Sequence, residues 1–468
     1  MSKRYDLAIV GAGSVGLIAA EFAAQLGARV VLLERDRIGG DCTWTGCVPS
    51  KALIRIAKVA HDMRSAAGFG IAATTPIVDM PRVRAYLDAA IARIYAGTTP
   101  EALAVKGIDV LFGAARFADR RTLVSDGARV RARNIIIATG ARPDIPDIPG
   151  IENVPYWTYR DVFSNEALPA SMIVLGGGPI GVEIAQAYAR LGTRVTIFAQ
   201  TFLPKEDPQA AAIVRRVFER EGITIVPERI RGLQRSGGRI SARSDGHECE
   251  AEKLFVASGR VAMLEGLQLE AAGVAYTSHG VTVNARLETT ARNIYAAGDV
   301  LGREQFSHYA GWQGFQAARN ALLPRNADGL SRILPRVTFC DPEVATVGLT
   351  EAEARKAHGD DVVVGRRSND RLDRAVTDND LDGTTTIVTR RNGVILGATI
   401  VGARAGEAIA EITLAMQAKL NVSLLAGTIH AYPTYASGVQ LVASELAVQR
   451  LLSGPRGILV RLASMFSR

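Results

Sequence analysis

The alternation of apolar and polar positions near the start of the chain predicts a strand, a tight turn, a helix and a second strand within residues 5–34. The turn carries Gly11, Gly13 and Gly16 in a Gly-x-Gly-x-x-Gly pattern. Glycines at this spacing permit a tight turn and let a pyrophosphate approach the helix N-terminus. Glu34 ends the second strand, where an acid would accept the ribose hydroxyls of a dinucleotide. These residues predict a dinucleotide-binding unit.

The same pattern recurs later in the chain. Gly176, Gly178 and Gly181 follow an apolar run, and a second strand follows the helix. Two such units predict two bound dinucleotides, whereas a decayed duplication retained for packing is the alternative.

The two copies differ at the end of the second strand. Glu34 of the first copy corresponds to Ala199, which is followed by Gln200. A site without a carboxylate does not repel a 2′-phosphate, so the second copy favours NADPH over NADH. The arginine expected directly after this strand is absent, and Lys205 and Arg194 are the candidates to replace it.

Further periodic segments extend the picture. Residues 135–140 read as a buried strand that ends in Thr139 and Gly140, a second place for close approach of backbone to cofactor. The proline-rich stretch 141–156 reads as an interdomain linker. Helices are expected at residues 50–67, 81–105, 308–323, 350–358, 404–420 and 435–452.

Composition narrows the class of protein. Of 468 residues, 48% are apolar and 22% are charged, which is ordinary for a soluble globular protein, and the net charge of +8 favours anionic ligands. No run of Lys and Arg indicates nucleic acid, and no apolar stretch reaches the ~18 residues of a membrane span. With four cysteines and a strand beginning at Tyr5, we expect a cytoplasmic protein without a signal peptide.

Two of the four cysteines, Cys42 and Cys47, lie in the stretch from Gly39 to Lys51. Positions five apart in a regular helix are separated by about 7.5 Å along its axis, whereas a disulfide needs its Cα atoms within roughly 6.8 Å. A bridge would therefore require the backbone to leave the helix between them, and Gly46 supplies that freedom. A helix beginning near Pro49 would direct its dipole at Cys47 and favour a thiolate. Two inert thiols on a core helix are the alternative.

The sequence Gly-Gly-Asp-Cys-Thr-Trp-Thr-Gly-Cys-Val-Pro-Ser-Lys resembles the redox-active segment of the flavin-dependent pyridine nucleotide-disulfide oxidoreductases, and the resemblance covers about residues 4–450. It implies that Cys42 exchanges with substrate, that Cys47 contacts the flavin, and that Lys51 sits near the flavin's reactive edge. Glu183 would pair with Lys51. Asp299 would contact the ribityl chain of FAD, with a helix N-cap before residues 308–323 as the alternative.

The resemblance also implies the architecture, an α/β fold with two Rossmann-like dinucleotide-binding domains and a C-terminal α+β dimerisation domain. A homodimer is expected, because the family's partner chain completes each active site. The expected divisions are 1–150 and 281–333 for the FAD-binding domain, 151–280 for the NAD(P)-binding domain, 334–455 for the dimerisation domain and 456–468 for a C-terminal tail. The tail carries an apolar helical face, and packing against protein is favoured over anchoring at a membrane interface.

One departure from the family affects the expected chemistry. Family members that reduce disulfides carry His-x-His-Pro-Thr-x-x-Glu near the C-terminus, whereas this chain has His430, Tyr432 and Ser437 at the positions of the two histidines and the glutamate. A tyrosine with a pKa near ~10 is a poor base at neutral pH. Tyrosine at this place resembles the mercuric reductases, although their C-terminal cysteine pair is absent after Cys340.

These observations predict a homodimeric FAD enzyme that passes electrons from NADPH, or NADH, through the Cys42–Cys47 pair to a small-molecule or metal-ion acceptor such as Hg(II), with no resident metal. The alternatives are a disulfide reductase of the dihydrolipoamide dehydrogenase or glutathione reductase type, and a quinone reductase that bypasses the thiols. A non-enzymatic flavin-bearing redox sensor is the third class. Tyr432 and His430 are the candidates for proton transfer, and a structural hydrogen bond is the favoured alternative for His430.

Overall fold

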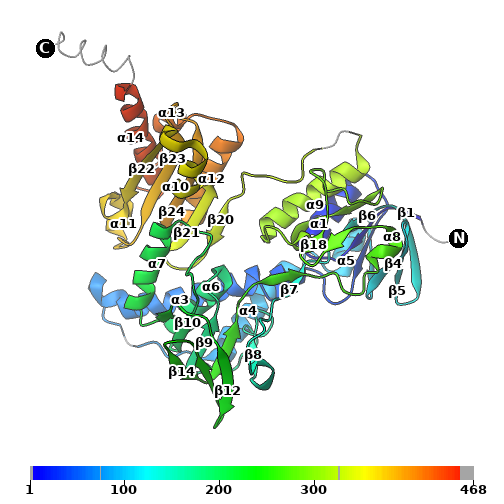
Figure 1. Cartoon of the computed structure of the whole chain (residues 1–468), viewed down its shortest axis with the longest axis horizontal. Coiled ribbons are helices and arrows are strands. Elements are labelled where there is room, and N and C mark those ends of the chain that lie inside the picture. Colours follow the sequence, from blue (N-terminus) through cyan, green and yellow to red (C-terminus); the bar gives the residue numbers. More distant parts are fainter. Residues whose placement is uncertain (1–3, 74, 325–326, 454–468) are drawn as a thin grey trace. The chain divides into compact units, whose positions relative to one another are not determined.

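The computed structural model describes residues 4–73, 75–324 and 327–453, and the tail expected at 456–468 lies outside them (Figure 1). The chain divides into two compact units. Unit 1 comprises residues 1–176, 190–193 and 230–331, and unit 2 comprises residues 177–189, 194–229 and 332–468. Each unit is described by itself.

A seven-stranded sheet forms the centre of unit 1, in the order β3-β2-β1-β6-β5-β4 with β19 also paired to β6. Strands β1, β2, β3, β6 and β19 pair in parallel, and β4, β5 and β6 form an antiparallel meander. The paired central segments of the parallel strands, such as residues 7–10 of β1, 30–33 of β2 and 135–137 of β6, are apolar and buried, as expected of a sheet covered on both faces. Their bounds are β1 Arg4–Val10, β2 Val30–Glu34, β3 Ile108–Phe112, β4 Ala115–Asp119, β5 Thr122–Ser125, β6 Ala128–Ile137 and β19 Ile294–Ala296.

Two helices of this unit, α1 (Ser14–Gln25) and α9 (Ser307–Leu322), pack side by side against the sheet (Figure 1). Small residues allow this close packing, since a side chain at Gly314 would collide with the backbone of Val15. Ser14 and Ser307, the first residues of the two helices, both hydrogen bond to the Cys42 thiol.

The segment expected to be one helix over residues 81–105 is two helices, α4 (Met80–Tyr95) and α5 (Pro100–Val105), so that expectation was wrong. Gly97 interrupts the helical run, and Thr99 accepts a hydrogen bond from the Ala102 amide at 3.2 Å as a new N-cap. Pro100 then takes the first position of α5, where its missing N–H is tolerated.

The rest of unit 1 consists of smaller sheets and helical turns. The proline-rich stretch 141–156 contains β7 (Ala141–Pro143), which pairs with β16 (Arg260–Ala262), and the turn η2 (Ile151–Asn153). Strand β15 (Lys253–Val256) pairs in parallel with β8 (Tyr156–Trp157) and β9 (Ser171–Leu175). The remaining elements are η1 Ala66–Phe69, β12 Gly232–Ser236, β13 Arg239–Arg243, β14 Glu248–Ala251, α8 Leu269–Ala272, β17 Tyr276–Thr277, β18 Gly280–Val281 and η3 Gly298–Leu301.

Unit 2 carries the second glycine turn from Gly177 onward and the C-terminal region. Strand β10 (Arg194–Phe198) pairs in parallel with β11 (Thr224–Val226), and α7 (Pro208–Arg220) connects them. The C-terminal region is an antiparallel five-stranded sheet in the order β20-β21-β24-β23-β22, which packs against α12 and α14. Its elements are β20 Arg336–Thr338, β21 Glu343–Gly348, α10 Glu351–His358, η4 Gly359–Asp361, β22 Val362–Ser368, η5 Asn369–Arg371, α11 Asp373–Thr377, β23 Thr384–Arg390, β24 Ile395–Gly402, α12 Ala405–Gln417, α13 Val422–Gly427 and α14 Ser437–Ser453.

The α/β fold class expected from the sequence is confirmed, with a βαβ glycine turn and a C-terminal α+β region. The helices expected near 308–323, 350–358, 404–420 and 435–452 agree with the structure to within three residues at each end. Among the described residues, no helix combines the length and apolarity needed to span a bilayer.

Candidate active site

The first glycine turn joins β1 to α1 and is shaped to receive a phosphate. Gly11 has φ of 107°, and a Cβ there would collide with the carbonyl oxygen of Ala138 at the end of the neighbouring strand region. Gly13 is the N-cap of α1 and has no side chain to satisfy the amides of the first turn, which also contains no acidic residue. The positive end of α1 is thus left to an anionic ligand, which fits the pyrophosphate of a dinucleotide.

Glu34, the predicted ribose ligand, stands at the end of β2 beside this turn. Its Oε2 accepts a hydrogen bond from the Ala12 amide at 2.7 Å, and its Oε1 accepts one from the Asp36 amide at 2.9 Å. The carboxylate therefore braces the turn itself. Its role toward ribose hydroxyls stays a prediction.

The cysteine segment is fastened directly to this turn. The Gly39 amide donates to the Ala12 carbonyl at 2.8 Å, and a Cβ on Gly40 would come within 2.9 Å of the Gly13 Cα. Gly39 and Gly40 both have positive φ, of 106° and 57°. The two glycines allow the segment to leave the turn sharply and bring the following cysteine close to the dinucleotide-binding loop.

The backbone leaves helical geometry between the two cysteines, as expected. Helix α2 (Gly40–Trp44) ends before Thr45, and α3 (Cys47–Ser65) begins after Gly46. Gly46 has φ of −129° and ψ of −115°, and a Cβ there would lie 2.7 Å from the Asp41 carbonyl oxygen. The glycine is required by this close approach.

The two thiols meet where three helices begin. Cys47 is the first residue of α3, and its Sγ lies 3.0 Å from the hydroxyl of Ser307, the first residue of α9. Hydrogen bonding to Cys47 is the largest influence on Cys42 and raises the pKa of its thiol, followed by burial. Hydrogen bonds from Ser307 and Ser14 partly lower it again. The pair can therefore share one proton while helix N-termini favour the negative charge.

Trp44, to which the sequence pattern assigns no role, anchors the residues between the thiols. Its indole Nε1 donates to the Ile38 carbonyl at 2.8 Å, and its ring lies 5.1 Å from that of Tyr95 in α4. The guanidinium of Arg37 stacks 4.6 Å from the same ring. A tryptophan between two closely spaced cysteines was the signal that could have indicated this anchor.

A largely buried ion pair lies beside the cysteine segment. Arg260 Nη1 contacts Asp299 Oδ2 at 2.8 Å, and their side chains are only 21% and 17% exposed. Burial raises the pKa of Asp299, Arg260 lowers it, and the charge of Asp41 raises it further. Asp41 itself accepts a hydrogen bond from the buried Tyr159 hydroxyl at 2.9 Å.

Asp299 is not the N-cap of α9, the alternative role considered for it from the sequence. It lies in η3, and Phe306 occupies the N-cap position of α9. A carboxylate held at a strand end by Arg260 retains lone pairs for the hydroxyl of a ligand.

The predicted contact at Thr139 and Gly140 follows β6. The Thr139 hydroxyl donates to the Met263 carbonyl at 2.7 Å, so it holds the backbone of the neighbouring segment. Gly140 has φ of 72°, and no atom lies within 4 Å of the position of a Cβ there. The space beside Gly140 is compatible with a close cofactor approach.

The second glycine turn leads into α6 (Pro179–Leu191), where Gly181 lies in the first turn and no acidic residue is present. Gly176, which belongs to unit 1, has φ of 121° and would collide with the Ala257 carbonyl oxygen if it carried a side chain. In unit 2, a Cβ on Gly178 would meet no atom within 4 Å. This open backbone fits a second dinucleotide.

Gln200 has an arginine beside it that the sequence reasoning missed. Arg229 Nε donates to Gln200 Oε1 at 2.5 Å, and the Arg229 side chain is exposed. Arg229 follows β11, whereas the sequence reasoning sought an arginine directly after β10. Because the carboxyl ends of parallel strands meet at one edge of a sheet, the end of the next strand was the place to search.

Lys51 and Glu183 lie on different units. Lys51 is half-buried on α3, and Glu183 is buried on α6, where its Oε1 accepts a hydrogen bond from the Phe339 amide at 2.8 Å. The pairing of these two residues therefore stays a prediction.

The C-terminal motif is held by contacts within unit 2. His430 is enclosed, with 7% of its side chain exposed; Nε2 lies 2.9 Å from Glu411 Oε2 and Nδ1 lies 3.0 Å from the Thr428 carbonyl oxygen. Tyr432 is 74% exposed, and its hydroxyl donates to Asp373 at 2.5 Å. That hydrogen bond and the charge of Asp373 raise the pKa of Tyr432.

Ser437, at the family's glutamate position, cannot supply the carboxylate that orients a catalytic histidine. Its hydroxyl lies 3.1 Å from that of Thr434 and donates to the Ala431 carbonyl at 3.2 Å. The hydroxyl fastens the motif to the start of α14, and no family-type dyad is formed in these described residues.

Two glycine turns that fit dinucleotides, with a thiol pair fastened to the first of them, define a dithiol oxidoreductase. The family model described as pyridine nucleotide-disulphide oxidoreductase matches residues 5–320, and its dimerisation domain matches residues 334–443. The chain belongs to this family. It is accordingly an oxidoreductase of a family that uses FAD and NAD(P)H, and the dimerisation domain indicates a homodimer.

Relatives of known name cover almost the whole chain. A mercuric reductase of Streptomyces lividans is 37% identical over 458 residues, 94% of this chain and 95% of that protein. A dihydrolipoyl dehydrogenase of Thermus scotoductus is 37% identical over 464 residues, 96% of this chain and 99% of that protein. The Cu(II) complex of the HOCl-induced flavoprotein disulfide reductase RclA from Escherichia coli has a TM-score of 0.85 and 28% identity, and the match covers 94% of this chain and 99% of that one.

Proposed function

We propose that this enzyme uses NADPH to reduce a thiophilic electrophile, such as Hg(II), at the Cys42–Cys47 pair. The observation that carries the proposal is the state of the C-terminal motif. Both nitrogens of His430 face acceptors within its own subunit, and Asp373 raises the pKa of Tyr432. An acceptor that takes two electrons without a proton suits a site in which neither residue is placed as a strong base.

The two cysteines would have different roles in this reaction. Cys42, whose pKa is raised by Cys47, would deliver its electrons once an electrophile binds, because a bound soft metal displaces the thiol proton. Cys47 would hold the charge at the start of α3, next to the Ser307 hydroxyl. The two thiolates would then give Hg(II) two electrons, so that Hg(0) leaves, the Cys42 proton passes to solvent and the two cysteines are joined as a disulfide.

The other site residues would position the cofactors. Gly11, Gly13 and Asp299 would hold FAD, which when bound accepts the hydride of the nicotinamide and supplies the electron pair. Lys51, paired with Glu183, would place a positive charge near the flavin. Thr139 and Gly140 would line the same cofactor.

The nicotinamide cofactor would be NADPH. Gln200 adds no negative charge at the end of β10, and Arg229 places an exposed guanidinium 2.5 Å from it. A guanidinium binds a phosphate through paired charge-assisted hydrogen bonds, which a ribose hydroxyl cannot match.

The names of the relatives agree with a metal acceptor. Several are mercuric reductases, and the RclA structure is a Cu(II) complex. A disulfide acceptor is the second candidate, because the dihydrolipoyl dehydrogenase of Thermus scotoductus is equally similar. The lack of a free histidine in the described C-terminal motif weighs against it.

The test is an anaerobic NADPH titration of the flavin-loaded enzyme, followed by turnover with Hg(II), Cu(II), lipoamide, glutathione disulfide and a quinone. We expect a long-wavelength thiolate–flavin band and fastest turnover with a metal ion. Cys42→Ser and Cys47→Ser should abolish that turnover. Unchanged turnover in both variants would reject the thiol route and favour direct transfer to a quinone.

A further inference from the structure

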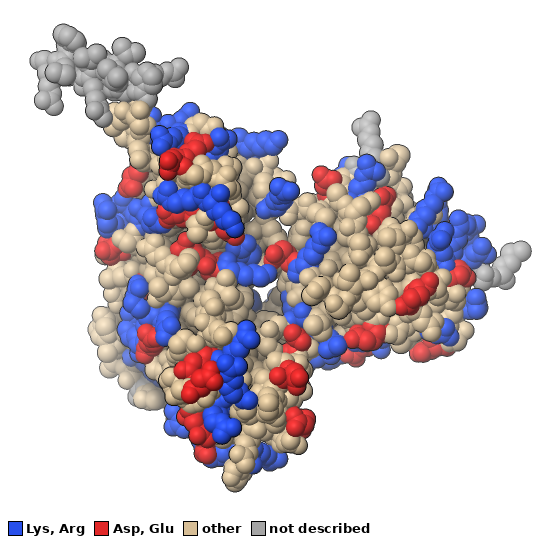
Figure 2. All heavy atoms as spheres, in the orientation of Figure 1, with Lys and Arg blue, Asp and Glu red and all other residues tan. Residues whose placement is uncertain are grey.

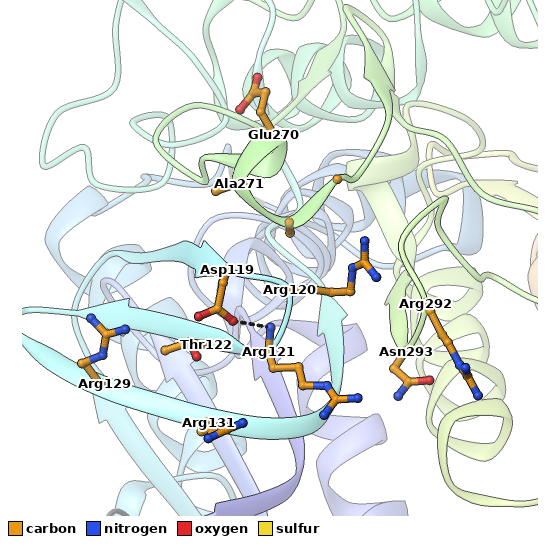
Figure 3. Close-up of a pocket in the computed structure, with 12 residues that line it drawn as sticks. Asp119, Arg120, Arg121, Thr122, Arg129, Arg131, Glu270, Ala271, Arg292 and Asn293 are labelled. Carbon is orange, nitrogen blue, oxygen red and sulfur yellow. Dashed lines mark hydrogen bonds between the residues drawn. The ribbon is translucent and has the colours of Figure 1, made fainter.

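A cavity of about 990 Å³ opens in unit 1 on the antiparallel meander (Figure 3). Strands β4, β5 and β6 form one side, and α8 and the turn before β19 form the other. Figure 2 shows basic side chains gathered over the part of this unit that carries β1 and β5. Five of the twelve residues that line the cavity are arginines, namely Arg120, Arg121, Arg129, Arg131 and Arg292.

The two carboxylates that line the cavity are engaged within the fold. Asp119 accepts a hydrogen bond from the Arg121 backbone amide at 2.8 Å, and this bond, together with the charge of Arg129, lowers the pKa of its carboxyl. Glu270 accepts a hydrogen bond from the Tyr276 hydroxyl, and in Figure 3 its carboxylate points away from the arginines. Among the described residues, no carboxylate forms an ion pair with any of the five guanidinium groups.

Strands β6 and β1 hold several arginines next to one another. Arg129 and Arg131 alternate with the buried Val130 and Ala132 along β6, so both arginines lie on the exposed face. Arg131 is directly opposite a further arginine, Arg4, on β1. Adjacent like charges on neighbouring strands are unfavourable, so the fold maintains an excess of positive charge that an anion would neutralise.

The types of residue that line the cavity indicate which class of anion it would bind. Arginine presents a planar fork of donors that matches phosphate oxygens, and the cavity contains no lysine. No aromatic side chain lines it, so nucleobases would have no surface on which to stack. Ala271, Ala272 and Gly273 are small and leave the side formed by α8 open, with room for an extended ligand.

We propose that this arginine cavity binds an oligophosphate, a chain of several consecutive phosphates that spans the arginines of β6, the β4–β5 turn and the segment before β19. The site is distinct from both glycine turns, and the proposal does not depend on the identity of the electron acceptor. Inorganic polyphosphate and nucleoside triphosphates share this chemistry, and the experiment separates them.

The test is isothermal titration of the full-length, flavin-loaded enzyme with inorganic tripolyphosphate in 0.1 M salt, with NADP⁺ present at saturation so that the nicotinamide site is filled. We expect saturable binding that weakens about tenfold or more in the Arg120→Gln/Arg131→Gln double variant. The matched control is Arg93→Gln/Arg235→Gln, which removes the same charge from two exposed arginines outside the cavity. It should bind within about twofold of the unmodified enzyme, since only the overall charge changes.

Parallel titrations with ATP and inorganic phosphate identify the ligand. Equal affinity for ATP and tripolyphosphate would support recognition of the phosphate chain, as would tighter binding of tripolyphosphate. Phosphate binding as tightly as tripolyphosphate, an equal loss of affinity in the control variant, or no saturable binding would each overturn the proposal. Flavin content and circular dichroism of both double variants check that they are folded.

Discussion

His430 and Glu411 are joined at 2.9 Å between Nε2 and a carboxylate oxygen, while Nδ1 of the same ring faces the Thr428 carbonyl. The two ring nitrogens are therefore turned toward a carboxylate and a carbonyl of the fold itself. A histidine held in this way fixes the segment that carries Tyr432 and has no nitrogen left for a substrate.

Replacing His430 should therefore affect stability more than catalysis. In His430→Asn, loss of the hydrogen bond to a largely buried carboxylate should lower the free energy of unfolding by about 1–3 kcal/mol. Turnover with Hg(II) should stay within about threefold. Chemical denaturation and kcat/KM measure the two effects, and Tyr432→Phe serves as a control at the exposed neighbour. A loss of kcat/KM by about a hundredfold at unchanged stability would instead assign His430 a catalytic role.

The reactivity of Cys42 should depend on Cys47. Because hydrogen bonding to Cys47 is the largest influence that raises the pKa of the Cys42 thiol, Cys47→Ser should lower that pKa toward its ordinary value. In the reduced enzyme, the rate of Cys42 alkylation by iodoacetamide should then rise at lower pH in Cys47→Ser than in the unmodified enzyme. Mass spectrometry identifies the alkylated residue. Superimposable pH profiles would show that the two sulfurs do not interact.

The Arg260–Asp299 pair should control stability in a pH-dependent way. In Arg260→Gln the largely buried Asp299 loses its counter-charge, which should lower the free energy of unfolding by about 3 kcal/mol near neutral pH. The pKa of Asp299 is already raised, and without Arg260 it should rise further. In the folded variant Asp299 then binds its proton more tightly than in the unfolded chain. The loss of unfolding free energy relative to the unmodified enzyme should therefore become smaller as the pH falls toward the ordinary pKa range of aspartate.

Denaturation at pH 5 and pH 8 tests this prediction. Arg142→Gln is the matched control, because Arg142 pairs at 2.9 Å with Glu265 and both side chains are well exposed. It should change stability little at either pH. A deficit of the same size at both pH values in Arg260→Gln would show that Asp299 is not the group responsible.

Arg229 and Gln200, which follow the ends of β11 and β10, should determine whether the enzyme prefers NADPH or NADH. Arg229→Ala should lower kcat/KM for NADPH about tenfold and leave that for NADH nearly unchanged, because only the 2′-phosphate is lost as a partner. Gln200→Glu should act in the same direction by repulsion. The control is Arg194→Ala, at the opposite end of β10. Binding of 2′,5′-ADP, measured by calorimetry, should weaken in parallel, and a clear NADH preference of the unmodified enzyme would end the idea.

The sequence was sufficient where a function depends on consecutive residues. The glycine turns, the break at Gly46 and the strand that ends before Thr139 all follow from local backbone requirements that a short motif expresses. The single helix expected over residues 81–105 failed because apolar spacing continued across Gly97, whereas a threonine cap and a proline start a new helix there.

The residues that were missed come from elements distant in sequence. Arg229 reaches Gln200 from another strand, and Glu411 reaches His430 from α12. Four arginines of the cavity lie within residues 120–131, and the pairing of β6 with β19 brings the distant Arg292 to them. Such contacts depend on strand register and helix packing, which the pattern of a single segment does not specify.

The anchoring of Trp44 has a consequence for the speed of electron transfer. The Trp44 ring is fixed by its contacts with Ile38, Tyr95 and Arg37. Two residues further along the chain, the Gly46 backbone lies tightly against the Asp41 carbonyl. A sulfur couple mounted on such a stiff support changes oxidation state with little displacement of surrounding atoms. The contribution of these surrounding residues to the reorganisation energy should accordingly be small, while the two sulfurs move as their bond forms and breaks.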